Sequence, residues 1–189
     1  MISNIPILSL TLLLVLIPRY LDAQDAHVNL RAKGNEGLVG SVHFHYNQGK
    51  VHITGQVSGL SPGHHGFHVH EFGDLSEGCT SFGGHFNPEK KDHAGPLSAM
   101  RHGGDLGNIE ADANGIARIN IVDAKLGQFG ADAIKGLGLV VHEKEDDLGM
   151  GPAGSDTKKT GNAGGRYACG VIGLAKPMTH IPQARVAVA

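Results

Sequence analysis

The sequence predicts an all-β protein. Of its 189 residues, 29 are glycine, and valine and isoleucine recur in short runs separated by Gly, Asn and Asp. Short apolar runs between turn-forming residues are typical of many short strands. In SVHFHY, residues 41–46, apolar and polar side chains alternate, as they do in a strand with one buried face. We find no amphipathic helix pattern, internal repeat or low-complexity tract in the sequence.

An uncharged apolar run, IPILSLTLLLVLI, occupies residues 5–17. It has the length of the hydrophobic region of a secretory signal peptide and is too short for a comfortable membrane span. We expect residues 1–23 to be a signal peptide cleaved after Ala23, residues 24–176 to form one domain, and residues 177–189 to be a C-terminal tail. An uncleaved membrane anchor is the alternative. No second such run follows, so we expect a secreted, extracellular protein without membrane contact once the leader is removed.

The composition fits one globular domain of modest charge. Apolar residues make up 40% of the chain, and the formal net charge is -2. No global field therefore indicates a nucleic acid or a membrane surface as partner. Any charged ligand has to be recognised by local groups.

The expected strands follow one another between clear turn sequences such as NQGK, SPGH and DANG. In the first strand Val42, Phe44 and Tyr46 share one face, while His43 and His45 share the other. We expect the histidine face to meet solvent, and the same holds for His52. The predicted strands cover residues 40–47, 50–59, 66–71, 115–122, 137–142 and 167–174.

Two long segments, residues 72–106 and 143–166, do not fit the strand pattern. Both are rich in Gly, Asp, Lys and His. Loops of this length in a compact domain are usually functional or disordered. The histidines of the first segment favour a functional loop.

The two cysteines, Cys79 and Cys169, belong to a chain that we expect to meet oxidising conditions. A disulfide between them is the natural interpretation. Closing a loop of about 90 residues stabilises a fold by roughly 4–5 kcal/mol in the chain-entropy model. Two free buried thiols are the alternative.

The 13 histidines are the main anomaly of the composition. In GFHVHEFGD, His68 and His70 are two residues apart, so a strand points both rings to one face. Two four-coordinate ions need eight protein ligands, and seven residues supply them only if one imidazole serves both; an open position for water is the alternative. Imidazole suits copper and zinc, and an Asp oxygen suits zinc. The seven candidate ligands in or beside the long loops are His68, His70, His85, His93, His102, His142 and Asp105.

These candidates fall into two types. His68 and His70 come from one predicted strand and His142 ends another, so they offer a rigid site. The others lie in one loop, HFNPEKKDHAGPLSAMRHGGD. A loop held around an ion by its own residues is a structural site, because metal binding replaces the core that the loop lacks.

Five motifs in this order, GFHVHEFGD, CTSFGGHFNP, GDLGN, VVHEKEDDLG and GNAGGRYACGVIGLA, resemble Cu/Zn superoxide dismutase of the secreted type. The resemblance covers residues 28–176. It implies an eight-stranded Greek-key β-barrel or sandwich, immunoglobulin-like, with two long functional loops. It also implies a homodimer. The chain differs from the family pattern at Phe82 and Gly84, where a small residue and a proline are usual.

The resemblance implies one copper and one zinc ion per subunit. Asp146 resembles a carboxylate that links a ligand of one ion to a ligand of the other. Cys79 and Cys169 match the family's disulfide. The implied copper ligands are His68, His70, His85 and His142, and the implied zinc ligands are His85, His93, His102 and Asp105.

The implied reaction converts superoxide to oxygen and hydrogen peroxide at the copper ion, since zinc has no redox chemistry. His85 would leave copper on reduction and deliver a proton. Arg166 would orient the anion through its planar guanidinium, and Lys144, Lys158 and Lys159 would attract it.

A copper-binding or chaperone-like member of the fold, without efficient turnover, is the alternative function. Such members lose copper ligands or the arginine, and here none is missing. An adhesion module would leave seven ordered ligand-type residues unexplained. His65 is interpreted as structural, and the remaining histidines as single surface imidazoles: His27, His43, His45, His52, His64 and His180.

Overall fold

The structure is a computed structural model that describes residues 25–34 and 37–176. The expectations for the leader and for the C-terminal tail fall outside these residues. In the described part, no helix is long and apolar enough to cross a membrane.

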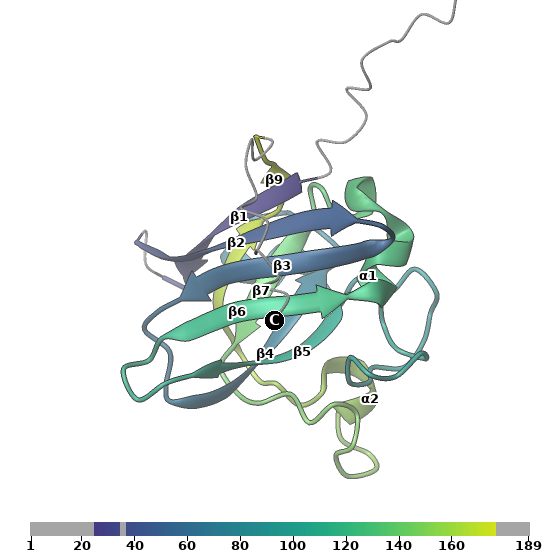
Figure 1. Ribbon diagram of the computed structural model, residues 1–189. Coiled ribbons are helices and arrows are strands. Elements are labelled where there is room, and N and C mark those ends of the chain that lie inside the picture. Colours follow the sequence, from purple (N-terminus) through teal and green to yellow (C-terminus); the bar gives the residue numbers. More distant parts are fainter. Residues whose placement is uncertain (1–24, 35–36, 177–189) are drawn as a thin grey trace, which may run out of the picture.

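Antiparallel strands form a closed barrel (Figure 1). The strand order is β2-β3-β6-β5-β4-β7-β8-β1-β9, and a further pairing of β1 with β2 closes the barrel. Some strands that are neighbours in the sheet, such as β3 and β6 or β4 and β7, are not consecutive in the chain. This order is a Greek-key arrangement. The expected eight-stranded barrel is confirmed, with the short β9 added. The strands are β1 (Asp25–Ala32), β2 (Leu38–Asn47), β3 (Lys50–Val57), β4 (Gly63–His70), β5 (Asp105–Ala111), β6 (Ala117–Asp123), β7 (Gly138–His142), β8 (Arg166–Val171) and β9 (Gly173–Leu174).

The core follows from the alternation seen in the sequence. On β2, Val42 and Phe44 are fully buried, and β3 contributes Val51 and Ile53. These side chains pack with Phe67 of β4 and its neighbours in one apolar cluster. Truncation of a buried Phe to Ala typically costs about 3–5 kcal/mol. The barrel is therefore a rigid support for the loops that leave it.

Two strands and the short helices were not predicted. β1 follows directly after the expected leader, in a stretch for which no strand was predicted. β5 begins inside the segment that the sequence analysis assigned to the first long loop. Helix α1 (Ala124–Phe129) begins at Asp123, whose side chain accepts a hydrogen bond from Leu126 N at 2.7 Å. The remaining helical turns are α2 (Thr157–Thr160), η1 (Gly78–Phe82) and η2 (Ala131–Ala133).

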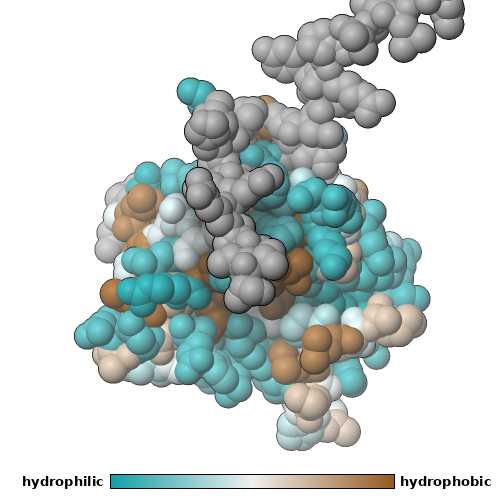
Figure 2. Space-filling model, viewed as in Figure 1, coloured by the Kyte–Doolittle hydropathy of each residue, from teal (hydrophilic) through white to brown (hydrophobic). Residues whose placement is uncertain are grey.

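The two long loops have the expected places. One joins β4 to β5, the other joins β7 to β8, and the latter contains α2. The predicted disulfide is confirmed: it joins Cys79 of the first loop to Cys169 of β8. The molecular face in Figure 2 is largely hydrophilic, with separate hydrophobic patches.

Candidate metal centre

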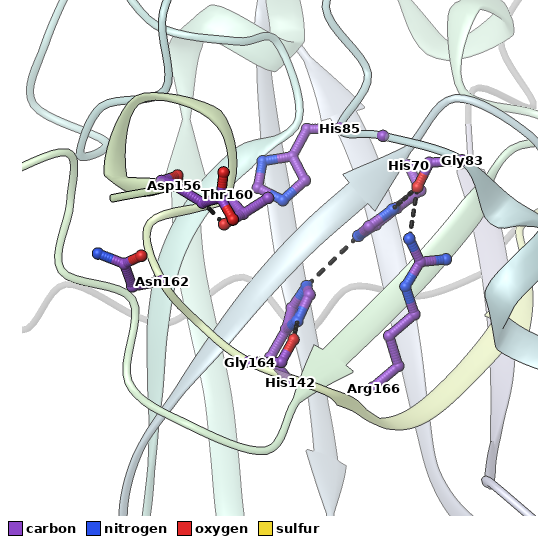
Figure 3. A pocket seen from close by; sticks show the side chains of 10 residues that line it. His70, Gly83, His85, His142, Asp156, Thr160, Asn162, Gly164 and Arg166 are labelled. Atoms are coloured by element: carbon purple, nitrogen blue, oxygen red, sulfur yellow. Dashed lines mark hydrogen bonds between the residues drawn. The ribbon is translucent and has the colours of Figure 1, made fainter. Parts of the chain in front are cut away.

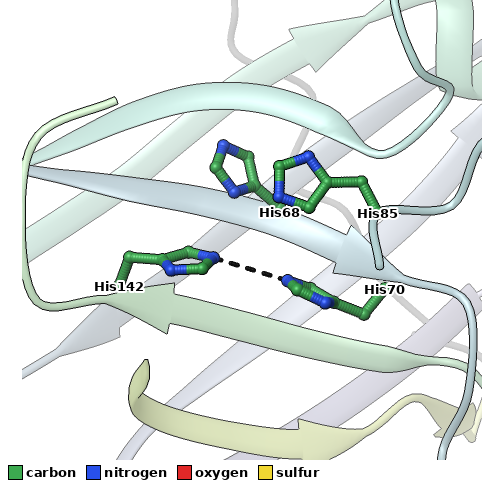
Figure 4. A group of neighbouring side chains, drawn as sticks. All are labelled: His68, His70, His85 and His142. Carbon is green, nitrogen blue, oxygen red and sulfur yellow. Dashed lines mark hydrogen bonds between the residues drawn. The ribbon is translucent and has the colours of Figure 1, made fainter. Parts of the chain in front are cut away.

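Four imidazoles converge where β4 and β7 lie side by side (Figure 4). Their ligand nitrogens all lie within 4.8 Å of one another. The Nε2 atoms of His70 and His142 are 3.4 Å apart. This four-histidine group consists of His68, His70, His85 and His142, and all four are buried.

A second set of ligand atoms lies next to it. His85 Nδ1 is 2.8 Å from Asp105 Oδ1, and His102 Nδ1 is 3.1 Å from the same oxygen. His93 Nδ1 lies 2.9 Å from it. Asp105 is the first residue of β5, so this carboxylate is fixed by the barrel although the sequence analysis placed it in the loop. This mixed group consists of His85, His93, His102 and Asp105.

Three buried ring nitrogens test whether metal ions fit. His68 Nδ1, His85 Nε2 and His93 Nδ1 have no hydrogen-bond partner in the described part of the chain. An unpaired polar atom in a protein interior is costly. Each of them belongs to one of the two ligand groups, so an ion in each group would satisfy all three. The residues present therefore fit two metal ions.

Backbone and carboxylate acceptors fix how the rings present their lone pairs. His68 Nε2 donates to Asp146 Oδ2 at 2.8 Å, which leaves Nδ1 facing the group. His70 Nδ1 donates to Gly83 O at 3.0 Å, and His142 Nδ1 donates to Gly164 O at 3.3 Å, which leaves both Nε2 atoms inward. A hydrogen bond from the outer nitrogen sets the tautomer and orientation of a metal-binding histidine.

Asp146 connects the two groups. Its Oδ2 accepts the hydrogen bond from His68, and its Oδ1 accepts one from His93 Nε2 at 2.8 Å. Asn108 holds the main chain at Asp146 through two hydrogen bonds of 2.8 Å. Gly161 packs against this pair, and a Cβ there would collide with Asp146 Oδ1 and His93 Nε2. The absence of a side chain at Gly161 thus lets the second loop cover the carboxylate.

Burial keeps the four-histidine group uncharged. Desolvation and the nearby His85 hold the pKa of His68 and that of His70 well below their usual value. The same two causes lower the pKa of His142 to about 4. Burial also lowers the pKa of His85. Neutral imidazole is the form that binds metal, so the rings are ready at neutral pH.

The carboxylates beside them are ionised. Burial alone would raise the pKa of Asp105, but the nearby imidazoles of His102, His85 and His93 outweigh it and hold that pKa well below its usual range. Burial would likewise raise the pKa of Asp146, but hydrogen bonds from His68 and His93 lower it. For His93, desolvation lowers the pKa, but the two nearby carboxylates prevail and raise it to about 9. Two buried negative charges thus face the positions that cations would occupy.

A cavity of about 360 Å³ opens onto the four-histidine group (Figure 3). Arg166 reaches into it, and its guanidinium donates to the carbonyls of Cys79, Thr80 and Gly83. Gly83 O also accepts from His70, so one carbonyl positions both the arginine and a candidate ligand. The lining residues are His70, Gly83, Gly84, His85, His142, Asp156, Thr160, Asn162, Gly164 and Arg166.

A model of the family "copper/zinc superoxide dismutase" matches residues 38–172. The chain belongs to this family. Two relatives support the assignment: an extracellular superoxide dismutase (Cu-Zn) of Drosophila melanogaster, and superoxide dismutase (Cu-Zn) 5 of Dictyostelium discoideum. The first is 52% identical over 142 residues, 74% of this chain and 78% of the relative. The second is 52% identical over 143 residues, 75% of this chain and 93% of the relative.

A solved structure agrees with the fold. The crystal structure of the clock protein EA4 superimposes with a TM-score of 0.74 at 49% sequence identity, and the match covers 80% of this chain and 95% of that one. Copper and zinc are the family's cofactors, and the two ligand groups are able to bind them. An ion in the four-histidine group would lie beside the open cavity, whereas an ion in the mixed group would be enclosed by the first long loop.

The predicted lysines lie outside this cavity. Lys158 and Lys159 are exposed on α2, next to the lining residue Thr160, and Lys144 is exposed after β7. Lys159 Nζ lies 3.7 Å from the carboxylate of Asp156, which lines the cavity. The three lysines are therefore exposed outside the cavity of the superoxide dismutase centre, and one of them, Lys159, is paired with Asp156.

Sequence reasoning missed several supporting residues. Asn108 lies in the GDLGN motif, but its hydrogen bonds to Asp146 could not be predicted, because a single Asn in a sequence more often indicates a turn. Asn162 bonds Asp147 Oδ2 at 2.6 Å and orders the loop that carries Gly164. His65 was not missed: it was interpreted as structural, and it is buried with its Nδ1 2.8 Å from the carbonyl oxygen of His142. These contacts join residues far apart in the chain, so spacing does not reveal them.

Proposed function

We propose that the four-histidine group binds copper and the mixed group binds zinc, one ion of each per subunit, in a secreted superoxide dismutase. The copper ligands are then His68, His70, His85 and His142, and the zinc ligands are His85, His93, His102 and Asp105. Asp146 acts as the carboxylate that fixes one ligand ring of each ion.

The observation that carries this assignment is the position of His85. Its Nδ1 faces Asp105 at 2.8 Å in the mixed group, whereas its Nε2 is buried without a partner beside His70 and His142. One ring therefore belongs to both groups. Seven residues then supply eight ligand positions.

The reaction consumes two superoxide anions and two protons and yields oxygen and hydrogen peroxide. When bound, copper supplies the one-electron exchange, and zinc adds charge without redox chemistry. Arg166 binds and orients the anion, because its fork of donors and permanent charge suit a small two-oxygen anion. His85 Nε2 would bind copper in one half of the cycle and hold a proton in the other, and it would pass this proton to the reduced oxygen, which is general acid catalysis.

A copper-carrying protein without turnover is the second candidate. Such a protein would keep the metal ligands, but its function would not require an arginine that three backbone carbonyls hold over the cavity. The geometry at Arg166 therefore favours the enzyme.

Superoxide consumption by the metal-loaded protein tests the assignment. His142→Ala is expected to lose nearly all activity, and Arg166→Ala to lose about tenfold or more in rate. Arg166→Lys should recover part of the rate, because it restores charge without the planar fork. His64→Ala, an exposed histidine outside both groups, is the matched control. Ordinary activity in His142→Ala would contradict the copper assignment, and an unchanged rate in Arg166→Ala would remove Arg166 from the mechanism.

The assembly belongs to the same proposal: two copies associate through the face beside the disulfide. Phe72 and Leu75 are each 53% exposed there. A cavity lined by Leu75, Cys79 and Val171 adjoins them. Sedimentation should give a dimer for the wild type and a monomer for Phe72→Glu with Leu75→Glu. Leu97→Glu, at an exposed leucine of the same loop that does not line this cavity, should remain dimeric. A monomeric wild type would overturn the dimer.

The chain boundaries complete the proposal. A leader of residues 1–23 is removed after Ala23, residues 24–176 form the enzyme, and residues 177–189 are a tail. N-terminal sequencing of protein recovered from culture medium should begin at Gln24. Retention of the apolar run on the cell surface would favour the membrane anchor instead.

A further inference from the structure

Histidines that belong to neither ligand group gather on the outer face of β1, β2 and β3, which lie side by side in the barrel (Figure 1). The sequence analysis interpreted them as separate surface imidazoles. The strand register places them in two neighbouring rows: His27 is opposite His43, and His45 is opposite His52. Their sequence neighbours Val28, Phe44 and Ile53 are buried, so the histidines point outward.

The first row has the spacing of a metal-binding pair. The ring centroids of His27 and His43 are 4.4 Å apart, with a tilt of 51° between the planes. Two imidazoles that share one ion, with bonds of about 2.0–2.1 Å and an angle between square-planar and tetrahedral, have centroids roughly 4.5–5 Å apart. In the metal centre itself, the rings of His68 and His85 are 4.1 Å apart, and those of His85 and His93 are 5.2 Å apart.

The surroundings leave this pair accessible and favour a cation. The residue opposite His27 on β9 is Gly173, which has no side chain to cover the ring. The residue opposite His43 on β3 is Thr54, which is small and exposed. In the neighbouring row Asp25 Oδ1 lies 2.6 Å from His45 Nδ1, so a carboxylate is close by. Burial and the nearby His43 also lower the pKa of His27, which favours its neutral, metal-binding form.

We propose that His27 and His43 form a further metal site, on the outer face of β1 and β2, for an exchangeable divalent transition-metal ion. Copper(II) is the preferred ion, because imidazole ligands bind it more tightly than nickel(II) or zinc(II). Water fills the other coordination positions. The second row does not take part as a ligand pair, since the rings of His45 and His52 are 6.5 Å apart; its aspartate contributes negative charge.

Calorimetric titration of copper(II) into the copper- and zinc-loaded protein, with glycine as a weak competitor, tests this site. The wild type should take up one copper ion per chain beyond its first copper and zinc, with a second copper signal of two-nitrogen type in electron paramagnetic resonance. His27→Ala and His43→Ala should each weaken this uptake by about tenfold or more, because a chelating pair becomes a single ligand. His52→Ala, a histidine of the same face, should bind as the wild type does.

Dismutase activity serves as the second measurement. All three variants should keep the wild-type rate, which shows that they fold and that the outer ion is separate from the reaction. The proposal is overturned if the wild type takes up no further ion, or if His27→Ala and His43→Ala bind the extra copper as tightly as the wild type. Both results would leave the assignment of the metal centre unchanged. That assignment is contradicted only if the metal-loaded protein lacks activity or does not hold its own copper and zinc ions.

Discussion

Asp146 illustrates how a single side chain organises a two-ion centre. Its two oxygens each accept a hydrogen bond of 2.8 Å, one from a candidate copper ligand and one from a candidate zinc ligand. A ligand ring that loses such a partner can rotate or adopt the other tautomer. In the proposed assignment, Asp146 therefore influences both ions through the rings of His68 and His93.

Asp146→Asn should weaken both metal sites. An amide donates through its nitrogen, so it can accept from only one of the two rings. We expect the affinity for zinc and copper to fall by about 10- to 100-fold, measured by competition with a chelator. The neighbouring Glu145→Gln is the matched control, because Glu145 is exposed and its carboxylate pairs with His64, which belongs to neither ligand group. Unchanged retention of both metals in Asp146→Asn would show that the rings are oriented without it.

At the scale of elements, the disulfide joins the first loop to β8 and thereby supports the cavity wall. The carbonyls of Cys79, Thr80 and Gly83, which hold Arg166, all lie in the segment that the disulfide anchors. Phe82 fills the space that Gly138 leaves open on β7 and is fully buried. A bulky residue that is unusual for the family thus anchors the loop from beneath.

Cys79→Ser is expected to lower both stability and rate. Loss of the cross-link should cost about 2–5 kcal/mol in the unfolding of the metal-loaded protein by denaturant. The rate should fall as well, because the acceptors of Arg166 become mobile. Cys169→Ser should reproduce both effects. A variant with unchanged activity would separate the disulfide from the positioning of Arg166.

The rim helix α2 allows a test of electrostatic attraction. Lys158→Glu reverses a charge next to the cavity, so we expect slower superoxide consumption at low salt and a smaller difference at high salt. Lys159→Glu should act in the same direction and more weakly, since Lys159 already lies beside Asp156. Lys50→Glu, at the exposed start of β3, is the charge-matched control. Equal rates for Lys158→Glu and Lys50→Glu would remove α2 from the attraction of the substrate.

At the scale of the whole molecule, local periodicity and residue types predict most of the strands, the two long loops and the seven candidate ligands. The closed eight-stranded barrel and the division of the ligands between two ions were implied by the resemblance to Cu/Zn superoxide dismutase. β1 was missed because DAHVNLRA follows the apolar leader closely, which hid its alternation. β5 was missed because its first residues belong to the loop motif GDLGN. Helix α1 has six residues, too few for a periodic signal, and it depends on Gly127 packing closely against Gly49. Contacts of this kind appear only in the folded chain.

Removal of the metals should affect the loops more than the barrel. The main core cluster contains no residue of the β4–β5 loop except the partly buried Phe86 at its margin. A second cluster contains Cys79 and Phe82 beside the disulfide, so we expect the remaining part of the loop, from His85 to His102, to depend on zinc for its order. Zinc bound at a concentration 1,000-fold above its dissociation constant adds about 4 kcal/mol, which raises the melting temperature by on the order of 10 °C. Hydrogen exchange should show that zinc added without copper to the metal-free protein protects the loop amides, whereas the protection of the barrel amides changes little. Equal protection of the loop in the metal-free protein would contradict a structural role for zinc.

The central claim is that one imidazole ring joins a redox-active ion to an inert one. The most direct measurement is anomalous diffraction at the copper and zinc absorption edges from crystals of the metal-loaded protein. We expect a copper peak within bonding distance of His85 Nε2 and a zinc peak within bonding distance of His85 Nδ1. Two ions that share no ring, or a single ion bound by all seven residues, would contradict it.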